Sequence, residues 1–189
     1  MSSRSTGRMP DRAEGMKEAA ASSASARADL TIRAAAPEDA DAVWRIIEPV
    51  IRAGETYALP GDMSKEAAIA YWFAPARRVF IARAGDELLG TYFLCANQKG
   101  GGDHVANAGY VTAEAARGRG IARAMCMDSI ERASKLGFLA MQFNFVIATN
   151  EGAIRLWQSL GFETVGRLPK AFRHPGAGLI DVLVMYRLL

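Results

Sequence analysis

Residues 109–123 combine residue types that suit an anion-binding turn with a spacing that places the turn before a helix. Gly118 and Gly120 follow an apolar run that ends at Val111, and a helical pattern begins near Gly120. At a helix N-terminus the first backbone N–H groups have no partner inside the helix, and the helix dipole adds positive potential. Glycines also let the main chain approach a bulky ligand without side-chain obstruction. The turn is therefore expected to hold an anion such as a pyrophosphate.

Three known kinds of glycine-containing turn can be compared with this one. A dinucleotide-binding fingerprint needs a third glycine where Arg123 stands and an acidic residue on the next strand, but residues 138–147 contain no acid. A P-loop needs Gly-Lys followed by Ser or Thr, which this turn lacks. On the glycines alone, an ordinary strand-to-helix connection remains an alternative.

A second stretch, further along the chain, begins at Asn150 and ends at Phe162. Together the two stretches resemble the coenzyme-binding motifs of the GNAT superfamily of N-acetyltransferases. The pattern Arg/Gln-x-x-Gly-x-Gly/Ala is matched by Arg117-Gly118-Arg119-Gly120-Ile121-Ala122. The pattern Asn-x-x-Ala-x-x-Leu-Tyr-x-x-x-Gly-Phe is matched from Asn150 onward, with Trp157 in place of the tyrosine. The resemblance covers residues 30–189.

This resemblance implies that acetyl-CoA is the cosubstrate and that its acetyl group passes to an amine. The backbone of the turn would hold the pyrophosphate, at Gly118, Arg119, Gly120, Ile121, Ala122 and Arg123. The strand before the turn would part from its neighbour and pair with the pantetheine arm, at Gly109, Tyr110 and Val111.

Asn150 and Trp157 complete the coenzyme-binding residues that the resemblance implies. The family residue at the position of Asn150 contacts the pantetheine, and asparagine also suits a helix N-cap, so the two roles are compatible. Trp157 replaces the tyrosine that serves as the acid in related enzymes. Its indole N–H can donate a hydrogen bond but cannot supply a proton.

The two strands that would part contain no carboxylate to serve as a general base. Residues 104–111 and 142–147 are mostly apolar but include Asn107 and Asn144. A buried amide without partners costs roughly 1–3 kcal/mol, so each of these side chains needs hydrogen bonds. Either both amides are satisfied at a distorted strand pair, or both face the gap and orient a polar substrate. In the second case Asn107 and Asn144 are the candidate catalytic residues.

This asparagine pattern is similar to that of the proline-analogue acetyltransferases of yeast, which acetylate cyclic secondary amines. There the matching asparagines are associated with substrate binding and catalysis. Residues 166–174, followed by Asp181, resemble in layout the phosphinothricin-type acetyltransferases, which act on small amino acids through a strand carboxylate that is missing here. The loop that would cover the acceptor side of the gap offers Glu55 and Tyr57 as substrate contacts. His174 is either a base on a loop folded over the site or a surface histidine.

The elements that must position these residues follow the order β-α-α-β-β-β-α-β-α-β-β. Strands are expected at residues 30–33, 78–84, 88–96, 105–111 and 138–147, with two final strands on either side of residues 167–178. Helices are expected to begin at residue 37 and to cover residues 64–73, 120–135 and 151–160. The order indicates a single mixed α/β (α+β) domain at residues 29–189. The resemblance implies a mostly antiparallel sheet that is splayed between two parallel strands and flanked by helices.

Residues 1–28 are expected to form a disordered tail, because they lack aromatic residues and cannot bury enough surface to offset their ordering entropy. The whole chain is half apolar and 23% charged, as in soluble globular proteins, and no apolar run is long enough to span a membrane. Cys95 and Cys126 cannot build a disulfide framework, and His104 and His174 give no zinc-ligand spacing, so no metal is expected. A net charge of +3 gives no argument for nucleic acid as a partner.

The sequence therefore predicts a cytoplasmic N-acetyltransferase that acts on a small amine, with an amino-acid-like or cyclic imino-acid acceptor. Transfer would be direct, in a ternary complex of enzyme, acetyl-CoA and amine. Two alternatives stay open: a module that senses acetyl-CoA without turnover, and a transferase for protein N-termini or lysines. A homodimer is compatible with the sequence.

Overall fold

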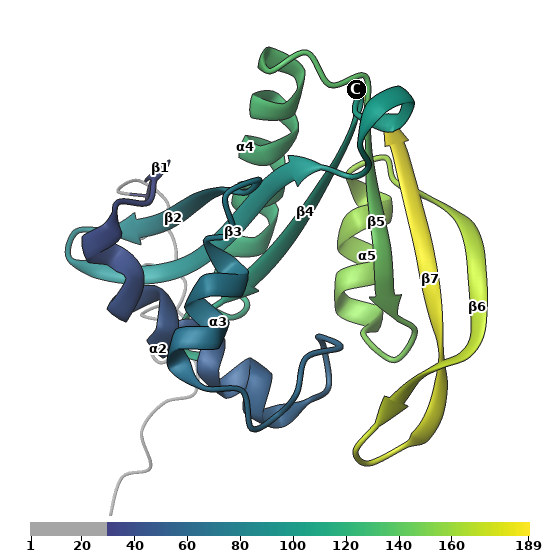
Figure 1. Ribbon diagram of the computed structural model, residues 1–189, viewed down its shortest axis with the longest axis horizontal. Helices are drawn as coiled ribbons and strands as arrows, with labels where there is room; N and C mark the ends of the chain where they lie inside the picture. The colour runs from purple at the N-terminus through teal and green to yellow at the C-terminus, as the bar shows by residue number, and fades with distance from the viewer. Residues whose placement is uncertain (1–29) are drawn as a thin grey trace, which may run out of the picture.

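The computed structural model describes residues 30–189, so the predicted tail at residues 1–28 lies outside the described residues. After β1 and one turn of 3-10 helix come two helices, three strands, and then helices that alternate with the remaining strands (Figure 1). The elements are β1 (Leu30–Ala34), α2 (Ala40–Ala53), α3 (Lys65–Trp72), β2 (Arg78–Ala84), β3 (Glu87–Ala96), β4 (Val105–Thr112), α4 (Ile121–Lys135), β5 (Ala140–Ile147), α5 (Glu151–Ser159), β6 (Glu163–His174) and β7 (Gly178–Leu188). The predicted order of elements is confirmed.

The strands form one seven-stranded sheet in the order β1-β2-β3-β4-β5-β7-β6. Every neighbouring pair is antiparallel except β4 and β5, which run parallel. This parallel pair is short: Val105 pairs with Ala140 and Ala106 with Met141, and no further pairing follows. Figure 1 shows β4 and β5 close together at one end and diverging along their length. The predicted splayed, mostly antiparallel sheet is confirmed.

Helices cover the sheet on both faces and give it two hydrophobic cores (Figure 1). On one face α4 and α5 contribute Ile121, Met125 and Trp157 to the larger core. On the other face α2 and α3 pack Ile47 and Trp72 against β2, β3 and β4. We call these the α4/α5 face and the α2/α3 face. Because strand side chains alternate, successive residues of β4 belong to opposite faces.

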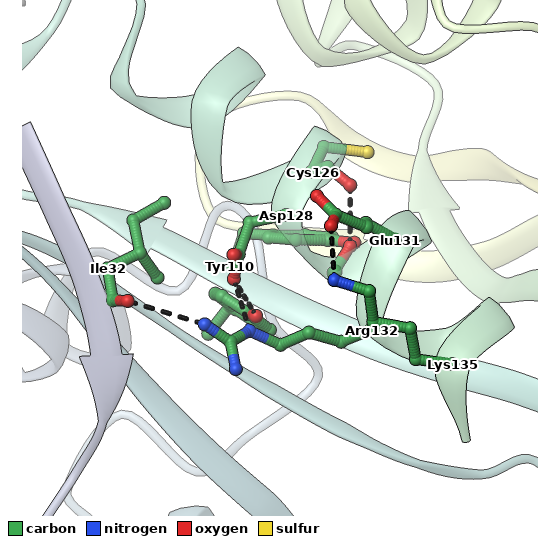
Figure 2. Close-up of polar contacts among 9 residues, drawn as sticks. Ile32, Tyr110, Cys126, Asp128, Glu131, Arg132 and Lys135 are labelled. Atoms are coloured by element: carbon green, nitrogen blue, oxygen red, sulfur yellow. Dashed lines mark hydrogen bonds and ion pairs between the residues drawn. The ribbon is translucent and has the colours of Figure 1, made fainter.

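A partly buried polar network fixes α4 against the sheet (Figure 2). The Tyr110 hydroxyl lies 2.7 Å from the Ser129 hydroxyl, which in turn donates to the Cys126 carbonyl of its own helix. One turn later Arg132 donates to Asp128 at 2.7 Å and to the Ile32 carbonyl of β1 at 3.3 Å. These bonds hold α4 at one angle to the sheet and thereby fix where its N-terminus lies.

The C-terminal strands differ from the prediction, which placed an interruption at residues 167–178. That expectation is wrong, because β6 continues to His174 and the turn is confined to residues 175–177. Pro169 and Lys170 lie in an irregular stretch of β6 where the pairing register shifts, and Lys170 has a φ of 52°. An edge strand tolerates proline because one side of it needs no ladder hydrogen bond. Asp181 bridges the irregularity, since it accepts from the Arg167 guanidinium and from the Lys170 N–H.

Thr91 joins α3 to the sheet in the core of the α2/α3 face. Its hydroxyl accepts from the Trp72 indole N–H at 3.2 Å and donates to the Phe80 carbonyl at 2.9 Å. Replacing Thr91 with valine is expected to lower the free energy of unfolding by about 1–3 kcal/mol, because the buried indole N–H loses its partner. Urea denaturation measures the change, with Thr91→Ser as the control that keeps the hydroxyl. An unchanged midpoint for the valine variant would contradict this role.

Candidate active site

The predicted anion-binding turn lies between β4 and α4, as expected. Gly118 and Gly120 have φ angles of 75° and 82°, in the left-handed region that favours glycine. Gly120 is the N-cap of α4, where no side chain caps the helix and no acid stands in the first turn. The first bond of the helix runs from the Ala124 N–H to the Gly120 carbonyl, so the N–H groups of residues 121–123 precede the helical ladder. These N–H groups are the donors that an anion needs.

The surroundings of the turn suit a phosphate-bearing coenzyme. A Cβ built at Gly118 would meet no atom within 4 Å, so the space above it is open. The Arg119 side chain reaches Glu87 at 3.5 Å, and its buried Nε has no partner among the described residues. Arg123 extends to the Ser159 hydroxyl at 2.8 Å. Unpaired N–H groups, an orphaned guanidinium nitrogen and free space together fit a pyrophosphate.

Beyond Ala106 the backbone of β4 turns toward the gap polar groups with which no neighbouring strand pairs. The Ala113 N–H donates to the Leu89 carbonyl, and the Asn97 N–H donates to the Val105 carbonyl. In an antiparallel ladder the bonded positions alternate, so odd-numbered residues of β4 bond to β3 and even-numbered ones point away from it. The N–H and C=O groups of Ala108 and Tyr110 therefore face the side where β5 has departed. Of the predicted pantetheine-binding residues, Tyr110 presents its peptide groups to the gap, whereas Gly109 and Val111 pair with β3.

Tyr57 reaches this gap from the loop between α2 and α3. Its hydroxyl donates to the Tyr110 carbonyl at 3.1 Å, and its ring packs edge-on against Trp72. Burial raises the pKa of Tyr57 well above its usual range, so the phenol stays protonated near neutral pH. A Cβ at Gly109 would lie 2.9 Å from the Tyr57 hydroxyl and 2.6 Å from the Phe93 ring. Glycine at this position is what allows both side chains to approach β4.

The structure places both candidate asparagines on the two strands that diverge. Asn107 shares the α2/α3 face with Val111, and no hydrogen bond joins its side chain to the other described residues. Asn144 lies at the irregularity of β5, where the register with β7 shifts. Its amide donates to Asn97 at 2.6 Å and accepts from Gln142 at 2.7 Å. The Asn144 amide is thus satisfied within the protein, whereas that of Asn107 is free to meet a ligand.

Asn97 and Gln142 are the two hydrogen-bond partners of the Asn144 amide, and neither was predicted as a site residue from the sequence. Asn97 directly follows β3, opposite the start of β4, and its amide oxygen accepts from Asn144 on β5. Their only signal in the sequence is a polar amide next to an otherwise apolar strand. We refer to Asn97, Asn107, Gln142 and Asn144 as the amide cluster.

Asn150 and Trp157 both lie on α5 or at its start. Asn150 is the N-cap and accepts from the Ala153 N–H at 3.2 Å, so its capping role is confirmed. Trp157 is buried, with its ring 5.1 Å from that of Tyr110 on β4 and 5.2 Å from that of Phe143 on β5. It therefore packs against both diverging strands, on the α4/α5 face.

For Glu55 and His174, the structure gives no contact with the residues of the gap within residues 30–189. The Glu55 side chain is exposed on the same loop as Tyr57, and the structure gives it no ion pair within residues 30–189. His174 ends β6, and its Nδ1 accepts from the N–H groups of Gly176 and Ala177. This ring nitrogen is used by the hairpin turn, which agrees with the surface alternative for His174.

A comparison with models of known protein families shows to which family this chain belongs. The model of the Acetyltransferase (GNAT) family matches residues 44–162. The chain belongs to the GNAT family. Both motif stretches lie inside the matched region.

Individual relatives agree with this assignment. The GNAT domain is 34% identical over 98 residues to the N-acetyltransferase aca1 of Schizosaccharomyces pombe, a match that covers 51% of this chain and 47% of aca1. It is 32% identical over 85 residues to protein SPT10 of Saccharomyces cerevisiae, covering 45% of this chain and 13% of SPT10. The matches therefore span about half of aca1 and a small part of SPT10.

Solved structures extend the comparison to the fold. A GCN5-related N-acetyltransferase from Kribbella flavida is 41% identical, with a TM-score of 0.83 over 86% of this chain and 99% of that one. A phosphinothricin acetyltransferase from Sinorhizobium meliloti, solved in complex with AcCoA, has a TM-score of 0.75 at 21% identity, over 85% of this chain and 89% of that one. At that identity the likeness shows the fold alone. Within residues 30–189, no helix is long and apolar enough to cross a membrane.

Proposed function

We propose that this GNAT enzyme transfers the acetyl group of acetyl-CoA directly to the nitrogen of a small amino-acid-like or cyclic imino-acid amine. The observation that carries the proposal is the divergence of β4 from β5, with the peptide groups of Ala108 and Tyr110 facing the gap. A pantetheine arm can pair with these groups while its pyrophosphate meets the N-terminus of α4. The thioester then lies beside the Tyr57 hydroxyl and the amide cluster.

In the reaction the amine nitrogen bonds to the acetyl carbon, the C–S bond breaks, and the proton lost by the amine balances the one gained by the thiolate. A covalent acetyl-enzyme is disfavoured, because neither cysteine is a ready nucleophile. Burial raises the pKa of the Cys126 thiol to about 12 and also raises that of Cys95. These thiols stay protonated at neutral pH, which supports direct transfer in a ternary complex.

Tyr57 is suited to position the amine. Its proton is engaged by the Tyr110 carbonyl, so the hydroxyl oxygen keeps lone pairs that can accept a hydrogen bond. An amine N–H can donate to these lone pairs while the nitrogen attacks the thioester.

Tyr57→Phe is therefore expected to lower kcat about 10-fold, in proportion to one lost hydrogen bond of roughly 1.5 kcal/mol. Steady-state kinetics measure kcat, and calorimetry measures the affinity for acetyl-CoA. Equal losses in kcat and in coenzyme affinity would contradict a role of Tyr57 in positioning the amine.

The test of the proposed function is incubation with acetyl-CoA and a panel of amines, followed by detection of free thiol. The panel contains amino acids, cyclic imino acids, simple amines, and peptides with a free N-terminus or a lysine. Thiol release that depends on small amino or imino acids is the expected result. Release with the peptides alone would favour a protein acetyltransferase. Tight binding of acetyl-CoA without release for any amine would favour a sensor, for which Trp157 and the missing strand carboxylate provide a basis.

A further inference from the structure

Arg77 occupies an unusual position on the α2/α3 face of the sheet. It lies in the turn between α3 and β2, and its side chain is half-buried. Its guanidinium carbon lies 4.0 Å from the ring centroid of Tyr71 and 4.0 Å from that of Phe93. Two aromatic rings therefore hold the guanidinium in a defined orientation, which reduces the entropy that ligand binding would cost.

Most of the hydrogen-bonding capacity of Arg77 is unused. One nitrogen, Nη1, donates to the Tyr71 carbonyl near the end of α3. Within residues 30–189 its Nε and Nη2 donate to no oxygen or nitrogen atom, its one further polar neighbour is the Cys95 thiol, and no carboxylate forms an ion pair with it. Other arginines in the fold do find acids, such as Arg132 with Asp128 and Arg33 with Asp39. The Nε and Nη2 groups form the edge that binds a carboxylate through two parallel hydrogen bonds.

The guanidinium of Arg77 lies next to the acceptor side of the gap, where its charge acts on Tyr57. Phe93, on which the guanidinium stacks, is the ring that approaches Gly109 beside the Tyr57 hydroxyl. Arg77 also lies beside the Cys95 thiol: its charge and a hydrogen bond from its guanidinium both oppose the rise in the pKa of Cys95 that burial causes. Cys95 is paired across the sheet with Asn107. The guanidinium is thus a close neighbour of both the amide cluster and the Tyr57 hydroxyl.

We propose that Arg77 binds the carboxylate of the acceptor amine and so makes the enzyme selective for amino or imino acids. The proposal rests on the proposed function, since it assigns the substrate class of the same site. An acceptor whose carboxylate lies on Arg77 would extend its nitrogen toward Tyr57 and the thioester. A carboxylate-free amine would leave the guanidinium unpaired and gain none of this binding.

The experiment compares each amino acid with the amine that lacks its carboxylate: L-proline with pyrrolidine, L-alanine with ethylamine, and L-leucine with 3-methylbutylamine. Rates of thiol release are measured for the wild-type protein and for Arg77→Gln, Arg77→Lys and Arg78→Gln. Arg78 is the matched control, because it is the next residue and is exposed. In the Gln variant of Arg77, we expect the KM for the accepted amino acid to rise roughly 30-fold, the loss that fits hydrogen bonds to a charged group. The corresponding kcat and the KM for acetyl-CoA should change less than about 3-fold, because the proposal assigns Arg77 to the carboxylate and not to the reacting atoms or the coenzyme.

Arg77→Lys keeps the charge but not the planar fork, so partial recovery of the KM is expected. The variant Arg78→Gln should behave as wild type. If Arg77→Gln affects an amino acid and its carboxylate-free amine equally, Arg77 serves the packing of Tyr71 and Phe93, and the inference is overturned while the proposed function stands. The same conclusion follows if the wild-type protein accepts both members of each pair equally well. Absence of thiol release with every pair would overturn the proposed function and the inference together.

Discussion

Gly120→Glu is expected to weaken acetyl-CoA binding by at least about 100-fold, close to 3 kcal/mol. The new carboxylate would stand at the N-cap of α4, where it would compete for the N–H groups of residues 121–123 and repel the pyrophosphate. Two unit charges 4 Å apart interact by about 4 kcal/mol at an effective dielectric constant near 20, so the expected loss needs only one such contact. Calorimetric titration with acetyl-CoA measures it.

Two controls separate charge from backbone strain in this experiment. Gly120→Gln has the same shape without the charge, so the loss of affinity that it shares with Gly120→Glu measures bulk and backbone strain, and the additional loss in Gly120→Glu measures the charge. Gly137→Glu places the same side chain at the other end of α4, at a glycine whose φ of 86° is close to the 82° of Gly120. A Cβ at Gly137 would meet no atom within 4 Å. Equal affinity losses in Gly120→Glu and Gly137→Glu would remove the turn from the coenzyme site.

Asn107→Ala is expected to lower turnover about 100-fold while the affinity for acetyl-CoA stays within about 2-fold of wild type. The reason is that an amide hydrogen bond fixes the acceptor nitrogen, and displacement by about 1 Å can cost on the order of 100-fold in rate. Because no hydrogen bond joins the Asn107 side chain to the other described residues, the alanine variant leaves no protein group unpaired. Its stability should therefore be unchanged, which thermal denaturation checks. A wild-type rate in a folded variant would exclude Asn107 from the reaction.

Asn144 makes a different contribution from Asn107, because its amide is held between Asn97 and Gln142. Asn144→Ala would leave both neighbours short of a partner, so a lower rate could arise through the cluster. Asn97→Ala is the matched control: it removes the same hydrogen bond from the other side. A similar loss of rate in both variants would give Asn144 a positioning role. A loss specific to Asn144 would place this amide against the substrate.

The order of strands and helices could be predicted from the sequence because local signals mark most boundaries. Ser64 caps α3 and the glycine turn opens α4, as the residue types indicate. The end of β6 could not be predicted in this way. Pro169 suggests a break, but β6 lies at the edge of the sheet, where a proline is tolerated. Edge position is a property of the complete sheet and is not visible in a local pattern.

Some residues of the candidate site could be predicted from local sequence patterns, and others only from the complete fold. Residues of the turn and of the Asn150 motif are consecutive, so their spacing alone identifies them. Arg77 and Asn97 could not be found, since each becomes meaningful only through neighbours brought in by the register of β3 with β4 and by the adjacency of β5. Neither the stacking of Arg77 on Phe93 nor the bond from Asn144 to Asn97 is encoded in a short motif.

The central claim is that the gap between β4 and β5 holds acetyl-CoA and presents its acetyl group to the α2/α3 face. The most direct measurement is a crystal structure of the protein with acetyl-CoA bound. We expect the pyrophosphate within hydrogen-bond distance of the N–H groups of residues 118–123. The pantetheine should pair with the backbone of Ala108 or Tyr110, and the thioester should lie beside the Tyr57 hydroxyl. A coenzyme bound elsewhere, or a thioester turned away from Tyr57 and the amide cluster, would contradict the claim.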